Sequence, residues 1–247
     1  MDLGLKGRTA LVFGASAGLG LASARALAAE GANVTIVGRR RDLVEREAER
    51  IGALGVRGDV TVPRDLERAV EQTVSAFGGI DVLVWNSGGP PPGKALDVTP
   101  ESLEQAVDLL VQPLVRLVHL CLPHLAASEA GRIIAITSIA SKEPVAHIAL
   151  SNAFRPSVAG YLKTLAGELG PQGITVNCVA PGRIATARLD HLYPDGPSDA
   201  DLADIPLRRW GEPRELGDVV CFLASARASY LSGQTFVVDG GLQRSLF

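Results

Sequence analysis

The sequence predicts an α/β fold, in which a doubly wound parallel sheet of about seven strands carries helices on both faces. Short apolar runs alternate with helical segments along the whole chain, as strands and crossover helices do around a parallel sheet. A glycine-rich turn follows the first of these runs. The composition, 47% hydrophobic but only 4% aromatic, fits small aliphatic side chains packed on buried parallel strands.

The individual elements follow from the same alternation. We expect strands over the apolar runs 10–13, 34–38, 55–60, 80–84, 132–137, 174–179 and 234–238. We expect helices over 21–29, 40–50, from Pro63, over about 100–127 and 155–169, and over 212–224. Residues 183–210 show little periodicity and are expected to form a substrate loop. No linker, repeat or low-complexity segment divides the chain, so residues 1–247 are predicted to be a single domain.

Composition argues against several classes of partner. The net charge of -3 does not show the excess of basic residues that is typical of proteins that bind nucleic acids. We find no signal-peptide pattern and no apolar run near the ~20 residues that span a bilayer, so we expect a cytoplasmic protein without a membrane partner. The three cysteines lie in apolar contexts without metal-ligand spacing, which predicts buried free thiols and no metal site.

The glycine turn after the first strand is a candidate phosphate site. Gly14, Gly18 and Gly20 lie between the apolar run 10–13 and an alanine-rich helical segment. Such a turn brings backbone N–H groups and a helix N-terminus against a phosphate, where a Cβ would block the approach. The spacing Gly-x-x-x-Gly-x-Gly is weak evidence alone, because simple strand-to-helix turns use similar glycines.

Other candidate residues follow other expected strands. The Asn86 loop, Ser138 and the turn at Pro181 each come directly after an apolar run. In a parallel sheet these positions share one edge, where ligands bind near the reversal of strand order. We therefore expect one cleft that contains the glycine turn and these loops.

Taken together, these features resemble the short-chain dehydrogenase/reductase (SDR) family over essentially the whole chain. The resemblance rests on the glycine turn, Asp59-Val60, Asn86-Ser87-Gly88, Ser138, Val176-Asn177, Pro181-Gly182, Gly233-Gln234 and Asp239-Gly240-Gly241. It implies a Rossmann-type sheet, an NAD or NADP cofactor and a homo-oligomer, often a tetramer. The overall likeness is to 3-oxoacyl-carrier-protein reductases. The cofactor-binding residues that it implies are Gly14, Ser16, Gly18, Leu19, Gly20, Arg39, Arg40, Asp59, Val60, Asn86, Ser87, Gly88, Pro181, Gly182 and Ile184.

The choice between the two nucleotides depends on the end of the second strand. An NAD site usually has a carboxylate there, which binds the ribose 2′-hydroxyl. Here the chain reads Val37-Gly38-Arg39-Arg40, with no acid and two guanidinium groups. A guanidinium matches a 2′-phosphate, so NADP(H) is favoured over NAD(H). The alternative is that Arg39 and Arg40 are only the solvated start of a helix.

Two positions near the turn depart from the family pattern. Phe13 and Trp85 stand where the family more often has Thr and Asn. Both substitutions remove a group that ties the glycine turn to the neighbouring strand by hydrogen bonding. Aromatic side chains there are still expected to pack.

The catalytic positions depart further. The family uses a Ser, a Tyr, a Lys four residues later and an Asn on the long helix. Ser138 matches the first, but the other positions hold Ser151, Arg155 and Leu110. A serine hydroxyl is a far weaker acid than a phenol, and a guanidinium does not relay protons. Ser138, Ser151 and Arg155 therefore remain as candidates with an altered way of delivering the proton.

Two loop residues are alternative proton donors. His147 lies four residues before Ser151, and Lys142 lies four residues after Ser138. Histidine titrates near neutral pH and is the better donor chemically, although either residue could be plain surface. Pro156 suits the first turn of a helix, which predicts that residues 151–154 form a loop or a displaced turn.

These residues leave more than one function open. The first is an NADP(H)-dependent oxidoreductase acting on a carbonyl or an alcohol, such as a 3-oxoacyl thioester. The second is a nucleotide-binding protein without turnover, acting as a sensor or as an oligomer partner of an active relative. A third is a lyase or epimerase that uses the cofactor differently.

Overall fold

A computed structural model describes residues 1–246 and confirms the predicted sheet. Seven strands pair in parallel in the order β3-β2-β1-β4-β5-β6-β7, so the strand order reverses between β1 and β4. The strands are β1 Thr9–Val12, β2 Asn33–Gly38, β3 Leu54–Arg57, β4 Val82–Trp85, β5 Arg132–Ile136, β6 Thr175–Pro181 and β7 Thr235–Val238. The α-helices are α1 Gly18–Ala29, α2 Arg41–Ile51, α3 Pro63–Phe77, α4 Pro100–Leu110, α5 Gln112–Ala127, α6 Ala149–Leu169, α7 Ala187–Leu192, α8 Asp199–Ala203 and α9 Pro213–Ala224.

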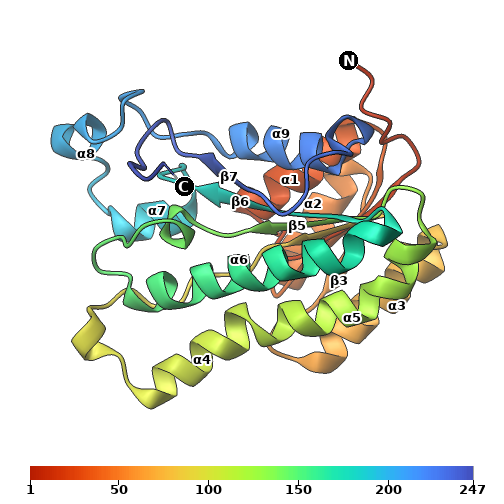
Figure 1. Ribbon diagram of the computed structural model, residues 1–247, viewed down its shortest axis with the longest axis horizontal. Helices are drawn as coiled ribbons and strands as arrows, with labels where there is room; N and C mark the ends of the chain where they lie inside the picture. The colour runs from red at the N-terminus through yellow and green to blue at the C-terminus, as the bar shows by residue number, and fades with distance from the viewer. Residues whose placement is uncertain (247) are drawn as a thin grey trace.

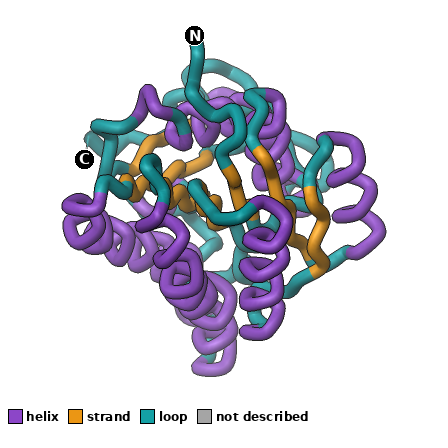
Figure 2. The backbone as a smooth tube through the Cα atoms, turned by 90° about the vertical axis from the view of Figure 1, so that its right-hand side faces the viewer, coloured by secondary structure: helices purple, strands orange, loops and turns teal. Residues whose placement is uncertain are grey.

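Helices cover both faces of the sheet, above and below it in Figure 1. Side chains alternate along each strand, so Leu11 and Phe13 of the first strand and loop point to one face while Ala10 and Val12 point to the other. The first face packs against α3, α5 and α6, and the second against α1, α2 and α9. Figure 2 shows the strands running through the middle of the molecule with helices around them. This burial on both faces explains the near-continuous apolar runs of the strands.

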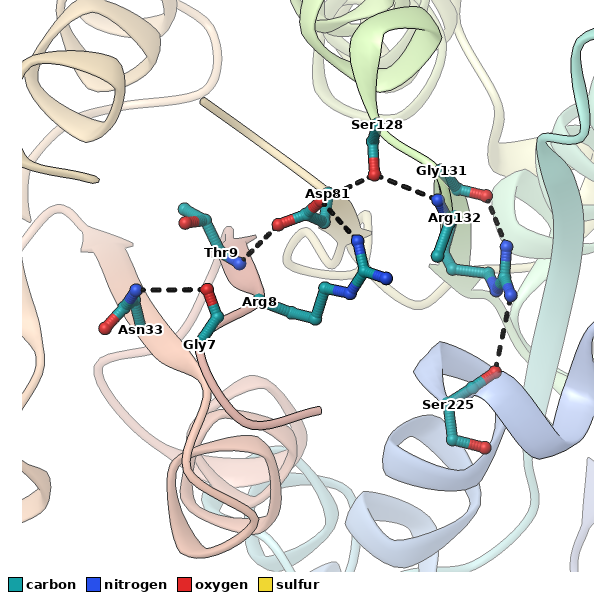
Figure 3. A network of polar contacts seen from close by, with 10 residues as sticks. Gly7, Arg8, Thr9, Asn33, Asp81, Ser128, Gly131, Arg132 and Ser225 are labelled. Atoms are coloured by element: carbon teal, nitrogen blue, oxygen red, sulfur yellow. Dashed lines mark hydrogen bonds and ion pairs between the residues drawn. The ribbon is translucent and has the colours of Figure 1, made fainter. Parts of the chain in front are cut away.

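A polar network joins the amino ends of the central strands (Figure 3). The Asp81 carboxylate accepts hydrogen bonds from the Thr9 backbone N–H at 2.7 Å, the Arg8 guanidinium at 3.3 Å and the Ser128 hydroxyl at 2.5 Å. Arg132, which is only 3% exposed, donates to the carbonyl of Gly131 at 2.9 Å. These contacts hold the edge of the sheet opposite to the candidate site.

The expected helix over about 100–127 is two helices, α4 and α5, separated at Val111. The cause is Pro113, which has no N–H to donate to the carbonyl of Leu109 and interrupts the helical ladder. Leu110, which the family resemblance predicts at the position of the catalytic Asn, is fully buried at this break.

The same segment also bears on the predicted absence of a membrane partner. We expected no apolar run long enough to span a bilayer, but Pro100–Ala127 is long and apolar enough to cross a membrane by length and composition alone. Core helices of soluble proteins pass the same test, and α5 packs one face on the sheet. The absence of a membrane partner therefore stays a prediction.

The prediction that residues 151–154 form a loop or displaced turn is wrong. Helix α6 begins at Ala149 and contains Pro156 in its interior. Tertiary contacts outweigh the lost helical bond: Leu150, Ser151 and Arg155 are buried, and the Asn152 side chain bonds both backbone groups of Val145, at 3.0 and 2.8 Å. The first turn of α6 is thus clamped to the loop that precedes it.

The expected substrate loop, 183–210, contains the two short helices α7 and α8, which lie at the left of Figure 1. Its ends are closed by a bridge between Ile184 and Gly211. Inside it, the Tyr193 ring packs edge-on against Trp210 at 5.6 Å between centroids, with the Arg183 guanidinium 5.7 Å from its centre. All three cysteines are buried and free, as predicted.

Candidate functional site

One cleft of about 1620 Å³ runs along the carboxyl ends of the strands, beside the reversal of strand order. Small-ligand pockets are usually about 300–1,000 Å³, so this cleft has room for a dinucleotide and a second molecule. The structure brings nearly all predicted site residues to it. The exceptions are Gly20 and Lys142, which do not line the cleft.

The glycine turn is held by Asn86, which follows β4. The Asn86 side-chain amide donates to the carbonyl of Gly14 at 3.0 Å. Gly14 has a φ of 60°, and a Cβ there would lie 2.5 Å from the Asn86 carbonyl oxygen. A Cβ on Gly20 would lie 2.5 Å from the Gly14 carbonyl oxygen. Gly20 therefore shapes the turn from behind rather than lining the cleft.

The start of helix α1 fits a phosphate group. No side chain caps this helix, and its first turn contains no acidic residue. The first N–H groups of a helix have no intrahelical acceptor, and together with the helix dipole they attract an anion. Gly18 and Leu19 line the cleft at this point, as does Ser16 in the turn. These residues would hold the pyrophosphate of a dinucleotide.

The predicted adenosine end lies where β2 and β3 finish. Arg39 and Arg40 are both exposed and line the cleft, and neither forms an ion pair within the part of the chain that the structure describes. Asp59 is half-buried, and one of its carboxylate oxygens accepts hydrogen bonds from the backbone and hydroxyl of Thr61. Val60 lines the cleft beside it.

The two aromatic departures from the family pattern pack together. Phe13 and Trp85 are fully buried, with ring centroids 6.2 Å apart at an angle of 49°. The Phe13 backbone N–H still donates to the Val84 carbonyl at 3.0 Å. The tie between the glycine turn and β4 is therefore carried by Asn86 and by main-chain bonds.

Ser138 and Ser151 come from different elements and line the same cleft. Ser138 follows β5, and its hydroxyl oxygen accepts a hydrogen bond from the Ala140 N–H at 3.1 Å. Because that bond uses a lone pair, the Ser138 hydroxyl proton remains available to a ligand. Ser151, in the first turn of α6, is 7% exposed.

Arg155 lies one turn after Ser151, and its side chain crosses to the end of β5. It is 7% exposed, and its guanidinium donates to the Ile136 carbonyl at 3.1 Å. Burial, and then the positive charge of Arg188, lower the pKa of Arg155 to about 10. The side chain is therefore still protonated at neutral pH, and it holds the strand end that precedes Ser138.

Of the two alternative proton donors, the cleft includes only His147. His147 is exposed, has an unusual φ of 61°, and accepts a hydrogen bond from the Gly93 N–H at its carbonyl, at 2.8 Å. Lys142 does not line the cleft, whereas its neighbour Glu143 does. The Glu143 carboxylate accepts from the Arg244 N–H at 3.2 Å, which brings the C-terminal segment across this end of the cleft.

The remaining wall comes from the segment after β6. Pro181, Gly182 and Ile184 line the cleft as predicted, and the Gly182 N–H donates to the Val238 carbonyl at 3.0 Å. Arg188 was not predicted as a site residue, yet it lines the cleft from α7 and donates to the Pro90 carbonyl at 2.8 Å. Its position in the expected substrate loop indicated that it could line the cleft. The sequence does not show, however, which arginine of that loop lacks a carboxylate partner.

Comparisons with known proteins agree with this geometry. Residues 14–243 match the family described as enoyl-(acyl carrier protein) reductase. A dehydrogenase/reductase SDR family member 4 from Oryctolagus cuniculus is 35% identical, with 96% of this chain and 94% of the relative covered. A 3-oxoacyl-[acyl-carrier-protein] reductase from Staphylococcus epidermidis is 34% identical, with 95% and 98% covered. The structure of L-sorbose reductase from Gluconobacter frateurii, complexed with NADPH and L-sorbose, superposes with a TM-score of 0.93 at 33% identity, covering 100% of both chains.

Proposed function

Because this chain belongs to the short-chain dehydrogenase/reductase family, we propose that it is an NADP(H)-dependent oxidoreductase. It reduces a carbonyl, such as a 3-oxoacyl group or a related ketone, or oxidises the matching alcohol. One observation carries the proposal: a single cleft joins the uncapped start of α1 to the Ser138 hydroxyl. The cofactor and the reacting carbonyl would thus meet at adjoining parts of one site.

NADP(H) is the proposed nucleotide because Arg39 and Arg40 are exposed at the end of β2 without an ion-pair partner among the described residues. A ribose 2′-phosphate supplies the missing negative charge, and a guanidinium binds it through paired hydrogen bonds. The L-sorbose reductase complex contains NADPH, which supports the same choice.

The residues of the cleft suggest how the reaction proceeds. When bound, NADPH supplies the hydride that adds to the carbonyl carbon. Ser138 holds the carbonyl oxygen, since its own proton is free to donate, and Ser151 provides a second hydroxyl on the same wall. His147 is the proposed source of the proton, directly or through water, because it lines the cleft and histidine is a common general acid in catalysis. Arg155 orients the strand end before Ser138 and keeps this region positive.

The second candidate is a nucleotide-binding protein without dehydrogenase turnover. It is favoured by Ser151, Arg155 and the buried Leu110, which occupy the positions where the family has its Tyr, Lys and Asn. Under this hypothesis the cleft binds NADP(H) as a signal, and the chain acts as a sensor or as an oligomer partner.

A turnover assay separates the two candidates. Purified protein is mixed with NADPH and a panel of 3-oxoacyl thioesters, diketones, quinones and oxo acids, and the NADPH absorbance is followed. Substrate-dependent loss supports the oxidoreductase, whereas tight NADPH binding without turnover supports the sensor. Ser138→Ala is expected to abolish the activity found, and Ser157→Ala, an exposed serine on α6, serves as the matched control. Equal activity in both variants would remove Ser138 from the mechanism.

We also propose that the protein is a homo-oligomer. Helices α5 and α6 keep half-buried hydrophobic residues, including Leu120, Leu122 and Ala159, at the margin of the core. Such residues gain burial when two copies pack together. Light scattering after size-exclusion chromatography tests this, and a mass near 25.8 kDa would refute it.

A further inference from the structure

Arg188 crosses the cleft from α7 to the loop that follows β4. Its guanidinium Nη2 donates to the Pro90 carbonyl at 2.8 Å. A Cβ on Gly89 would lie 3.1 Å from the same nitrogen, so the absence of a side chain there lets the guanidinium lie against the loop. The Pro90 carbonyl thus holds one side of the guanidinium, while Arg188 as a whole is exposed and lines the cleft.

The positive charge of Arg188 is not matched by a carboxylate. No ion pair joins Arg188 or Arg155 to an acidic residue within residues 1–246. Two acidic side chains that line this end of the cleft have other partners: Asp204 pairs with Arg183 at 3.3 Å, and Glu143 accepts from the Arg244 N–H at 3.2 Å. The two unmatched arginines thus face the cleft together.

Arg155 adds a second sign of a missing anion. Its side chain is more than nine-tenths buried, yet its Nε has no hydrogen-bond partner among the described residues. Burial lowers the pKa of Arg155, and the positive charge of Arg188 lowers it further. A buried cation with a second cation nearby is costly, and a bound anion between or beside the two offsets that cost.

We propose that Arg188 binds the carboxylate of the substrate, so that this enzyme acts on oxo acids or the matching hydroxy acids rather than on neutral ketones. This inference rests on the proposed oxidoreductase function. Within the part of the chain that the structure describes, the Arg188 side chain forms one hydrogen bond, so several of its five N–H groups remain for a ligand. Two parallel N–H groups of a guanidinium can bind the two oxygens of one carboxylate.

The location suits a substrate rather than the cofactor phosphates. The pyrophosphate has its own site at the uncapped start of α1, and the 2′-phosphate has one at Arg39. Arg188 instead contacts Gly89 and Pro90, on the loop whose Gly93 is bonded to His147. The carboxylate would therefore lie on the substrate side of the cleft, and the carbonyl would face Ser138.

A binding experiment without turnover tests the inference. The protein is saturated with NADP⁺ and titrated calorimetrically with acetoacetate and 2-oxobutyrate, each compared with its own primary amide. At least one acid is expected to bind about ten-fold or more tightly than its amide. Arg188→Gln should abolish this preference, and Arg188→Lys should keep part of it. Arg214→Gln, which removes one charge from a side chain 78% exposed on α9, is the matched control and should keep all of it.

Several outcomes would overturn the assignment. These are equal binding of every acid and its amide, an unchanged preference in Arg188→Gln, or tighter binding of inorganic phosphate than of either acid. A large loss of NADPH affinity in Arg188→Gln with the acid preference unchanged would assign the arginine to the cofactor instead. The two proposals fail separately. Selective acid binding without NADPH oxidation refutes only the oxidoreductase, while equal turnover of acids and amides refutes only the carboxylate site.

Discussion

The side-chain amide of Asn86 donates a hydrogen bond to the carbonyl oxygen of Gly14 across 3.0 Å. This contact joins the loop after β4 to the turn before α1, at the point where the strand order reverses. It holds the glycine turn in the shape that presents the start of α1 to the cleft. Phe13 has no polar side-chain atom, and the Trp85 indole N–H has no hydrogen-bond partner among the described residues, so Asn86 holds the turn together with main-chain bonds.

Asn86→Ala is expected to weaken NADPH binding by about 5- to 150-fold, because an unsatisfied or lost hydrogen bond costs roughly 1–3 kcal/mol. Fluorescence titration with NADPH measures the change. Asn33→Ala is the control, since Asn33 also bonds a backbone carbonyl, that of Gly7, but lies at the opposite end of the sheet from the cleft. Unchanged affinity in Asn86→Ala would show that the turn is held by its main chain alone.

Arg39→Asp is expected to reverse the cofactor preference. The substitution repels a 2′-phosphate and supplies the carboxylate that binds a ribose 2′-hydroxyl. Dissociation constants for NADPH and NADH, measured on the original protein and the variant, test this. NADPH binding should weaken by about ten-fold or more, since a charge-assisted hydrogen bond contributes roughly 1.5–3 kcal/mol. If the original protein binds NADH more tightly than NADPH, the argument from Arg39 is wrong.

The double variant Ser151→Tyr, Arg155→Lys tests the proton-delivery argument. Ser151 lines the cleft, so a phenol in its place would project toward the substrate, and its O–H is a far stronger acid than that of serine. Burial and the charge of Arg188 lower the pKa of Arg155. A lysine at this position would be exposed to the same two effects, and its ordinary pKa is already lower than that of arginine. Turnover of a substrate found in the panel is expected to rise by about ten-fold or more, as general-acid catalysis contributes at least that.

The single variants are the controls for this prediction. Ser151→Tyr alone is expected to gain less, since the phenol lacks the neighbouring ammonium. A double variant that folds and binds NADPH normally, yet turns over no faster, would show that proton delivery does not limit the rate.

Glu47→Gln is expected to lower the free energy of unfolding by about 2 kcal/mol at pH 7. Glu47 is 4% exposed, and burial opposes its ionisation, but hydrogen bonds from Arg25 and Arg46 outweigh burial and hold the pKa of its carboxyl below the usual value. The depressed pKa means that the ionised form stabilises the fold above about pH 4.5, and that this stability is lost as the pH falls below that value.

Urea unfolding between pH 7 and pH 3 measures the effect. The difference between Glu47→Gln and the original protein should shrink as the pH falls below about 4.5. Glu45→Gln is the control, because Glu45 is 58% exposed and, within residues 1–246, pairs only with Arg41, so its loss should cost at most about 1 kcal/mol. A difference that stays constant over the whole pH range would contradict the role of the Glu47 charge.

The order of the elements was predictable from local patterns. A short apolar run predicts a strand that is buried on both faces of the sheet. The predicted strands therefore agree with the observed ones to within a few residues. The glycine turn, Asn86, Ser138 and Pro181 were assigned to one cleft because parallel strands place their carboxyl ends at one edge. That argument needs only the topology, which the structure confirms.

Local signals failed where tertiary contacts competed with them. Pro156 indicated a helix start, but Asn152 clamps Val145 and the buried first turn of α6 keeps the helix intact before the proline. Pro113 was passed over within an apolar run, although it divides α4 from α5. In both cases the proline removes one helical hydrogen bond, and the surrounding contacts decide whether the helix continues past it.

The sequence by itself determined the sheet and the family resemblance, and it predicted which residue types stand at the reacting positions. Those follow from periodicity and from the order of motifs, which are properties of the chain alone. Only the tertiary structure decided that His147 lines the cleft and Lys142 does not, and that Asn86 holds the glycine turn. It also decided that Arg188 and Arg155 line one cleft without a carboxylate partner among the described residues, whereas Arg183 on the same segment has Asp204. Charge compensation depends on distances between side chains far apart in the sequence, and these exist only once the chain has folded.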